Sequence, residues 1–142
     1  MLQKLLVAIR EIQLPVSLTP MLPPQPEPAD ADSKAITQSW IWKRLGNFTR
    51  SGDILIAESG TAQFGFPDAD LPADVRYLTQ VYYGSIGYTV GACLGAALAQ
   101  KEIQAKGGMT GGRTILVVGD GSLQLTVQEI STMIRLGLNP LM

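Results

Sequence analysis

The sequence predicts an α/β fold built around a parallel sheet. Two short apolar runs, residues 54–57 and 114–118, contain β-branched side chains and are bounded by turn residues, which is typical of buried strands. Segments with the apolar spacing of helices precede, separate and follow these runs. Because strands that alternate with helices are usually joined by crossover connections, we expect the strands to run in the same direction.

Residues 1–13 predict a short amphipathic helix that ends a preceding domain. They lack the long uncharged core and the small-residue cleavage site of a signal peptide. The larger apolar side chains share one helical face: Leu2, Leu5, Leu6 and Ile9. Residues 14–32 contain six prolines, which disfavour a helix or a central strand and predict an extended, semi-rigid linker. Residues 33–142 are then expected to form the domain that holds the strands.

The first helix of this domain is expected to begin after a hydroxyl cap. Ser33 and Thr37 are both suitable caps, and the apolar pattern continues to Phe48. Trp40 and Trp42 lie within this pattern, so we interpret them as packing residues.

A short strand at residues 75–78 and two further helices are expected after the first buried strand. The helix over residues 85–106 carries glycines every three or four residues, and this smooth face should pack closely against another helix or a ligand. These glycines are Gly84, Gly87, Gly91 and Gly95. The last helix is expected over residues 123–138. Its inward face should consist of Leu123, Val127, Ile130, Ile134 and Leu138.

The composition excludes several kinds of site. The net charge is −1 without a basic block, so the sequence gives no reason to expect nucleic acid as a partner. The absence of histidine excludes a Ser-His-Asp triad and histidine-based zinc sites within the chain. The single cysteine, Cys93, excludes an internal disulfide, and we expect it to be a small buried apolar residue. Residues 84–99 are too short and too rich in glycine for a bilayer span, so we expect a cytoplasmic protein with no membrane partner.

Asp120 is the first candidate for chemistry. It follows the apolar run 114–118, and ligands of open α/β sheets bind at the carboxyl ends of the strands. A carboxylate between two glycines fits a Mg²⁺ ion that bridges to a diphosphate, with the N–H groups of Gly121 and Ser122 receiving the phosphate. The alternative interpretation, in which Asp120 only caps the following helix, is equally compatible with this short motif.

Two other segments are candidates. Ser59 and Thr61 also follow a predicted strand, although their spacing alone favours a turn in which the hydroxyls satisfy local backbone groups. Gly84 permits a close backbone approach before a helix, and Ile86 offers a rigid apolar surface to a planar ring. The glycines of the chain match neither the dinucleotide fingerprint nor the phosphate-binding P-loop.

Taken in order, these three segments resemble the thiamine-diphosphate-dependent 2-oxo-acid decarboxylases, in particular the fungal-type pyruvate decarboxylases. The resemblance spans about residues 37–140. It is densest over residues 119–135, which read Gly-Asp-Gly-Ser-Leu-Gln-Leu-Thr-Val-Gln-Glu-Ile-Ser-Thr-Met-Ile-Arg. It implies an incomplete parallel-sheet thiamine-diphosphate-binding domain with helices on both faces, and an enzyme that requires Mg²⁺.

The resemblance implies a role for individual residues of each segment. Asp120 would bind Mg²⁺ through its carboxylate, while Gly121 and Ser122 would contact the diphosphate. Ser59 stands where these enzymes often have a threonine near the substrate. The implied contacts to the rest of the cofactor are Thr61, Gly84, Ser85 and Ile86, of which Ile86 would hold the cofactor bent. In the family, the cofactor's carbanion attacks the keto carbon of pyruvate, carbon dioxide leaves, and acetaldehyde is released.

The chain ends at Met142, before the Asn-Asn sequence that accompanies Gly-Asp-Gly in this family. We therefore expect a weak magnesium site, an unpaired sheet edge beside residues 114–118, and a chain that is poorly stable and inactive by itself. The family forms homo-oligomers in which a second subunit completes the site. Two alternatives are a non-catalytic interaction module that uses the glycine face, and a fragment of another thiamine enzyme, such as an acetolactate synthase or an indolepyruvate decarboxylase.

Overall fold

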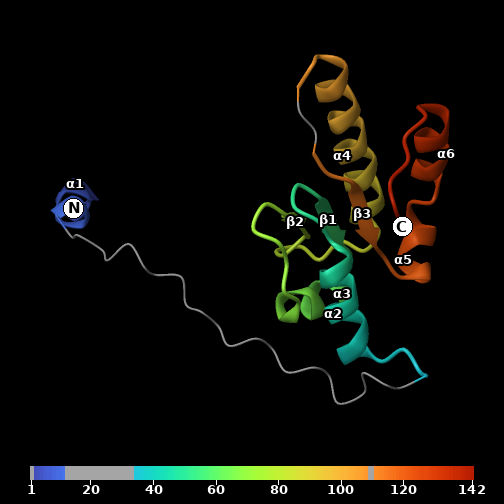
Figure 1. Cartoon of the computed structure of the whole chain (residues 1–142), viewed down its shortest axis with the longest axis horizontal. Coiled ribbons are helices and arrows are strands. Elements are labelled where there is room, and N and C mark those ends of the chain that lie inside the picture. Colours follow the sequence, from blue (N-terminus) through green and yellow to red (C-terminus); the bar gives the residue numbers. More distant parts are fainter. Residues whose placement is uncertain (1, 12–33, 109–110) are drawn as a thin grey trace.

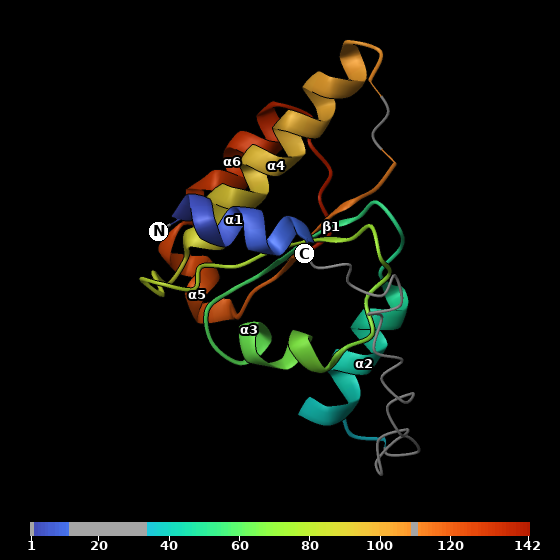
Figure 2. The same cartoon turned by 90° about the vertical axis from the view of Figure 1, so that its left-hand side faces the viewer.

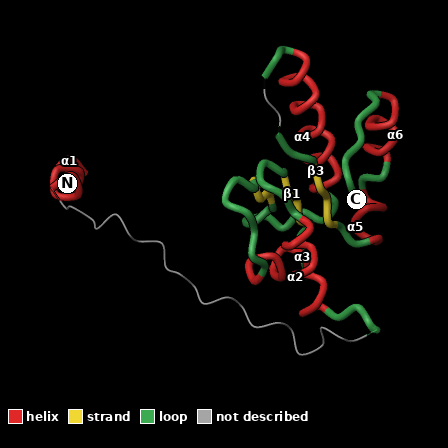
Figure 3. The backbone as a smooth tube through the Cα atoms, viewed as in Figure 1, coloured by secondary structure: helices red, strands yellow, loops and turns green. Residues whose placement is uncertain are grey.

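The structure is a computed structural model that describes residues 2–11, 34–108 and 111–142 (Figures 1 and 3). Its elements are α1 (Leu2–Glu11), α2 (Gln38–Phe48), β1 (Ile54–Ala57), α3 (Thr61–Gly65), η1 (Phe66–Asp68), β2 (Arg76–Leu78), α4 (Tyr88–Ala105), β3 (Thr114–Val117), α5 (Asp120–Leu125) and α6 (Gln128–Arg135). The predicted N-terminal helix is present as α1, and the predicted proline-rich linker lies outside the described residues.

The three strands form one parallel sheet in the order β2-β1-β3, which confirms the predicted fold class. β1 is the central strand. Its first residue, Ile54, pairs with Arg76 of β2 and with Thr114 of β3. All three strands therefore have their carboxyl ends at the same edge of the sheet.

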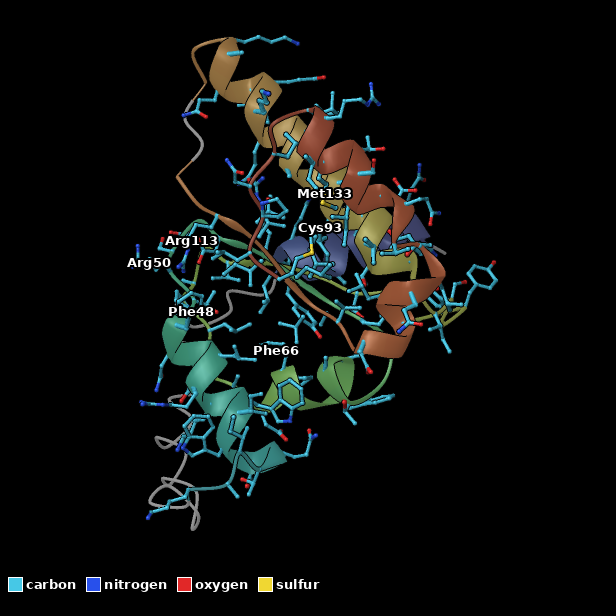
Figure 4. The ribbon with its side chains drawn as sticks, turned by 90° about the vertical axis from the view of Figure 1, so that its right-hand side faces the viewer. Phe48, Arg50, Phe66, Cys93, Arg113 and Met133 are labelled. Carbon is cyan, nitrogen blue, oxygen red and sulfur yellow. The ribbon has the colours of Figure 1, made fainter. Side chains whose placement is uncertain are left out.

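Helices cover both faces of the sheet, as predicted (Figure 2). Alternate residues of a strand point to opposite faces, so β1 contributes to two apolar clusters. Ile54 and Ile56 pack with α4 and α6, around side chains that include Cys93 and Met133. Leu55 and Ala57 pack on the other face, in the cluster that contains Phe66. Figure 4 shows Phe66 on the opposite side of the sheet from Cys93 and Met133.

Cys93 is fully buried, as expected for a small apolar residue. Burial raises the pKa of its thiol to about 11, so the side chain is held in its neutral form. Within residues 2–11, 34–108 and 111–142, no helix combines the length and the apolar character that a membrane crossing requires.

α2 begins as the sequence predicts. Thr37 is its N-cap, and the Thr37 hydroxyl accepts a hydrogen bond from the N–H of Trp40 at 3.3 Å. Trp42 packs against Phe66, with the two ring centroids 5.4 Å apart. An ideal Cβ at Gly65 would lie 2.3 Å from the Trp42 ring, so this close contact between α2 and α3 requires glycine.

The C-terminal helical region departs from the prediction in two respects. The expected single helix over residues 123–138 is interrupted by a turn at Thr126 and Val127, which separates α5 from α6. The inward face of α6 also differs from the one expected. Met133 is buried, whereas Ile134, which was expected to face inward, is 74% exposed.

The structure also bears on the expected glycine face, the start of α4 and the expected open edge of the sheet. Gly91 and Gly95 are exposed, and an ideal Cβ at either position would meet no atom within 4 Å, so no described residue packs on the glycine face of α4 there. Packing of a ligand or another helix at this face stays a prediction. α4 also begins at Tyr88 rather than at residue 85. Finally, β3 is the edge strand of the sheet, as expected, but its outer side is bridged at one point by the residues around Leu141. The N–H of Leu116 donates to the carbonyl of Leu141 at 2.8 Å, and the N–H of Leu141 donates to Thr114 at 2.9 Å.

Candidate functional site

Three segments lie at the carboxyl edge of the parallel sheet. Residues 58–61 follow β1, residues 79–87 follow β2, and residues 118–122 follow β3. All residues that the sequence analysis proposed for the site belong to these segments. The carboxyl edge is where open parallel sheets bind their ligands.

Asp120 is the first residue of α5, and its side chain is exposed. The N-cap position is occupied by Gly119, so the alternative interpretation of Asp120 as the cap is wrong. The first helical hydrogen bond of α5 is donated by the N–H of Leu123 to the carbonyl of Gly119 at 2.9 Å. The N–H groups of the three residues before Leu123 have no partner within a regular helix. An ideal Cβ at Gly121 would meet nothing within 4 Å, so the backbone here can be approached closely.

Asp120 is a single carboxylate rather than part of a ligand cluster. In the described part of the chain, no group of three or more Asp, Glu, Cys or His side chains could hold a metal ion. The donor set that is present therefore fits one bond to a hard cation whose other ligands are phosphate oxygens or water. Mg²⁺ at this position remains a prediction.

Ser59 and Thr61 flank a glycine in an unusual conformation. Gly60 is the N-cap of α3. It has φ +121°, a backbone conformation that residues with a side chain rarely adopt. The Ser59 hydroxyl is buried and has no hydrogen-bond partner among the described residues. Thr61 is exposed and lines a shallow hollow of about 650 Å³. The other lining residues are Gln38, Ser39, Trp42, Gly60, Phe64, Gly65 and Asp68.

Gly84, Ser85 and Ile86 lie in the exposed loop that leads to α4. The N–H of Ser85 donates to the side-chain oxygen of Gln80, which ties the loop to the end of β2. The Ile86 side chain is 60% exposed. The neighbouring large side chains are exposed as well: Val81 67%, Tyr82 94% and Tyr83 89%. Together with Leu125, which is 61% exposed, they give this edge of the sheet an apolar surface.

The sequence analysis missed two threonines that connect these segments. The Thr89 hydroxyl donates to the Glu58 carboxylate at 2.5 Å, and the Thr126 hydroxyl donates to the carbonyl of Gly87 at 2.7 Å. No local pattern distinguishes them from other helical threonines. The available signal was Glu58, a carboxylate directly after a buried strand, which requires a hydrogen-bond donor if it is itself buried.

Comparison with known proteins identifies the family of the chain. Residues 59–142 match the family described as thiamine pyrophosphate enzyme, C-terminal TPP binding domain. The chain is 52% identical over 143 aligned residues to pyruvate decarboxylase isozyme 2 of Saccharomyces cerevisiae, covering 98% of this chain and 24% of that protein. It is 48% identical over 141 residues to a pyruvate decarboxylase of Kluyveromyces lactis, with the same two coverages. A pyruvate decarboxylase of Aspergillus terreus is 55% identical over 111 residues, 78% of this chain and 18% of that protein.

The chain thus spans about a quarter of the length of the curated relatives that it matches. The family match begins at Ser59 and includes Thr61, Ile86 and Asp120, which lie on the three segments at the carboxyl edge. The chain belongs to the thiamine pyrophosphate enzymes, and residues 59–142 correspond to the C-terminal TPP-binding domain of that family.

Proposed function

We propose that this chain is the cofactor-binding part of a non-oxidative 2-oxo-acid decarboxylase that depends on thiamine diphosphate and Mg²⁺. The observation that carries the proposal is the position of Asp120 at the start of α5. Its exposed carboxylate lies beside N–H groups that the helix leaves free, at the carboxyl end of a parallel strand. This arrangement offers one bond to a metal ion and several to a diphosphate.

The other segments would hold the remainder of the cofactor. Thr61 and the backbone of Gly84 and Ser85 would contact the aminopyrimidine ring, and the exposed Ile86 side chain would support the bent form. Ser59 would face the substrate. In the bound state the cofactor supplies the carbanion chemistry of decarboxylation, while the protein orients it. The unpartnered hydroxyl of Ser59 supports this proposal, because buried hydroxyls normally have a partner.

Pyruvate is the proposed substrate, since the relatives described above are pyruvate decarboxylases. We infer that the chain does not turn over pyruvate by itself, because the described residues provide one metal-binding carboxylate and leave the site exposed. We also infer that the apolar surface formed by Val81, Tyr82, Tyr83, Ile86 and Leu125 faces a second subunit, since apolar side chains gathered at a site usually mark an interface. A cytoplasmic location is proposed as well, and cell fractionation that recovered the protein elsewhere would contradict it.

Isothermal titration with thiamine diphosphate, with and without Mg²⁺, tests the proposed function. We expect weak binding that requires Mg²⁺, because Asp120 would hold the metal ion and the ion would supply positive charge for the diphosphate. The substitution D120N should lower the affinity by about tenfold or more, since loss of even an indirect ligand contact costs 10- to 100-fold in metal sites. Asp70 is also exposed, so D70N is the matched control and should bind as the original chain does.

Two results would contradict these statements. If D120N bound the cofactor as well as D70N, Asp120 would have no part in the metal site. Tight binding by the original chain would contradict the inference that its metal site is incomplete.

A further inference from the structure

The start of α4 is held by a hydrogen bond from a different element. Gly87, the N-cap of α4, has φ +86°, and no side-chain hydrogen bond caps the helix. Its carbonyl accepts a hydrogen bond from the Thr126 hydroxyl at 2.7 Å. An ideal Cβ at Gly87 would lie 3.0 Å from Leu125 and 3.2 Å from the Ser122 carbonyl. The residue that follows Ile86 therefore lies directly against α5, the helix that begins with Asp120.

The same turn of α4 is also bound to the end of β1. The Thr89 hydroxyl donates to one oxygen of Glu58 at 2.5 Å, and the N–H of Ser59 donates to the other at 3.0 Å. Thr89 and Glu58 are 0% and 2% exposed. Among the described residues Glu58 forms no ion pair, so these two bonds are the ones that satisfy its carboxylate.

Two hydroxyls thus connect all three segments of the site. Thr89 joins the start of α4 to residues 58–61, and Thr126 joins it to α5. We propose that Thr89 and Thr126 are positioning residues, which we call the threonine link, and that they fix Ile86 relative to Thr61 and Asp120. This inference rests on the proposed function, in which Ile86 and Thr61 contact the ring end of the cofactor and Asp120 its diphosphate end.

The threonine link should affect the binding of long and short ligands differently. A ligand that spans both ends needs the ring contacts and the diphosphate contacts at the correct separation. Under the proposed function, inorganic diphosphate with Mg²⁺ would contact only the start of α5, so its binding would not depend on the position of Ile86. Loss of the link should therefore weaken binding of the longer ligand and spare the shorter one.

Hydrogen–deuterium exchange of the chain without ligand tests the link directly. T126V removes the hydroxyl at a half-buried position, and T126S retains it. The control is T49V. The Thr49 hydroxyl also donates a hydrogen bond of 2.7 Å, to the carbonyl of Leu45, but Thr49 lies at the end of α2, away from the candidate site. We expect T126V to raise exchange at residues 88–92, where the helical hydrogen bonds of α4 begin, by about fivefold, with T126S and T49V unchanged there, since one hydrogen bond that holds this end of the helix is lost. Equal exchange in T126V and T49V would overturn the proposal.

Titration then tests the consequence for ligands. T126V should bind thiamine diphosphate with Mg²⁺ about fivefold more weakly, and inorganic diphosphate with Mg²⁺ unchanged. An equal loss for both ligands would show general damage to α5 and would overturn the proposal. If the original chain binds neither ligand, the proposed function fails, while the exchange experiment still decides whether the link positions the loop.

The pair T89V and T89S repeats the comparison on the other side of α4. Thr89 is fully buried, so circular dichroism must first show that T89V is folded. Faster exchange of residues 58–61 in T89V, restored in T89S, is the expected result. If T89V is folded and exchanges as T89S does, Thr89 has no positioning role; if it is unfolded, the Thr126 variants decide the proposal.

Discussion

Asp53 is a buried carboxylate with both oxygens occupied. One oxygen accepts a hydrogen bond from the backbone N–H of Arg113 at 2.7 Å, and the other accepts a hydrogen bond from the backbone N–H of Arg50 at 2.9 Å. The Arg113 guanidinium adds an ion pair at 2.6 Å and also lies 4.5 Å from the Phe48 ring (Figure 4). Burial by itself would raise the pKa of Asp53, yet the hydrogen bonds and charge of Arg113, with the N–H of Arg50, hold that pKa below its ordinary value.

The substitution R113M should destabilise the chain in a pH-dependent way. It leaves the Asp53 charge buried without its cation, which costs about 3 kcal/mol at neutral pH. Because the folded-state pKa of Asp53 is lowered, its contribution to stability is present above about pH 4, the unfolded value, and is lost as the pH falls through the folded-state pKa. The unfolded state is common to both chains, so the difference in unfolding free energy between the original chain and R113M should shrink as the pH falls toward the lowered folded-state pKa of Asp53 in the original chain.

Urea denaturation between pH 7 and pH 3 measures this difference. R50M is the control. It removes a neighbouring arginine side chain but keeps the backbone N–H of residue 50, which donates a hydrogen bond to Asp53. A constant gap between R113M and the original chain across this range would show that the charge of Asp53 is not the cause.

The strands meet closely at their amino ends, where two glycines replace side chains. An ideal Cβ at Gly112, just before β3, would lie 1.8 Å from the carbonyl oxygen of Gly52, just before β1. Gln100 of α4 strengthens the same region by donating to the Gly112 carbonyl at 3.1 Å and accepting from the Thr114 hydroxyl. This close contact between the two backbones fixes the register of β1 and β3 and leaves no space for a side chain at residue 112.

G112A should therefore lower the free energy of unfolding by about 2 kcal/mol or more, because backbone must move to admit the methyl group. Gly111 is the matched control, since an ideal Cβ there meets nothing within 4 Å, and G111A should change stability by less than about 0.5 kcal/mol. Urea denaturation of both variants tests this. Equal stability of G112A and G111A would mean that the strands can separate at this point without cost.

At the scale of the whole molecule, the described residues form one three-stranded sheet with an apolar cluster on each face and an exposed carboxyl edge. Both apolar clusters are formed within the chain, whereas the described residues do not enclose the candidate site. Asp120, Thr61 and Ile86 are all exposed. An enclosed site is important for decarboxylation, because exclusion of water strengthens the interactions that orient the cofactor.

We therefore expect the chain alone to release no acetaldehyde from pyruvate, even with saturating thiamine diphosphate and Mg²⁺. A coupled alcohol dehydrogenase assay measures the product. Analytical ultracentrifugation of the same sample shows whether two chains associate through the apolar surface at this edge. Turnover by a monomeric chain would contradict both the proposed inactivity and the proposed need for a second subunit.

Much of this architecture could be predicted from the sequence, because its signals are local. The strands are short apolar runs between turn residues, and Thr37 caps α2 through a residue three positions away. The break between α5 and α6 has no such signal, since Thr126 and Val127 are neither glycine nor proline. The hydroxyl bonds of Thr89 and Thr126 join residues 31 and 39 positions apart, so they follow from tertiary packing alone. The positions of the candidate residues at one edge were predictable, but their connections were not.

The contact between β1 and β3 also has a consequence for how the chain folds. The two strands are paired with an offset of 60 residues, and so are Asp53 and Arg113. Closing so long a loop costs conformational entropy, which grows only slowly with loop length. Once the loop has closed, the backbone ladder, the ion pair and both apolar clusters can form together. Because all these contacts depend on the same closure, the sheet is expected to assemble in a single cooperative step.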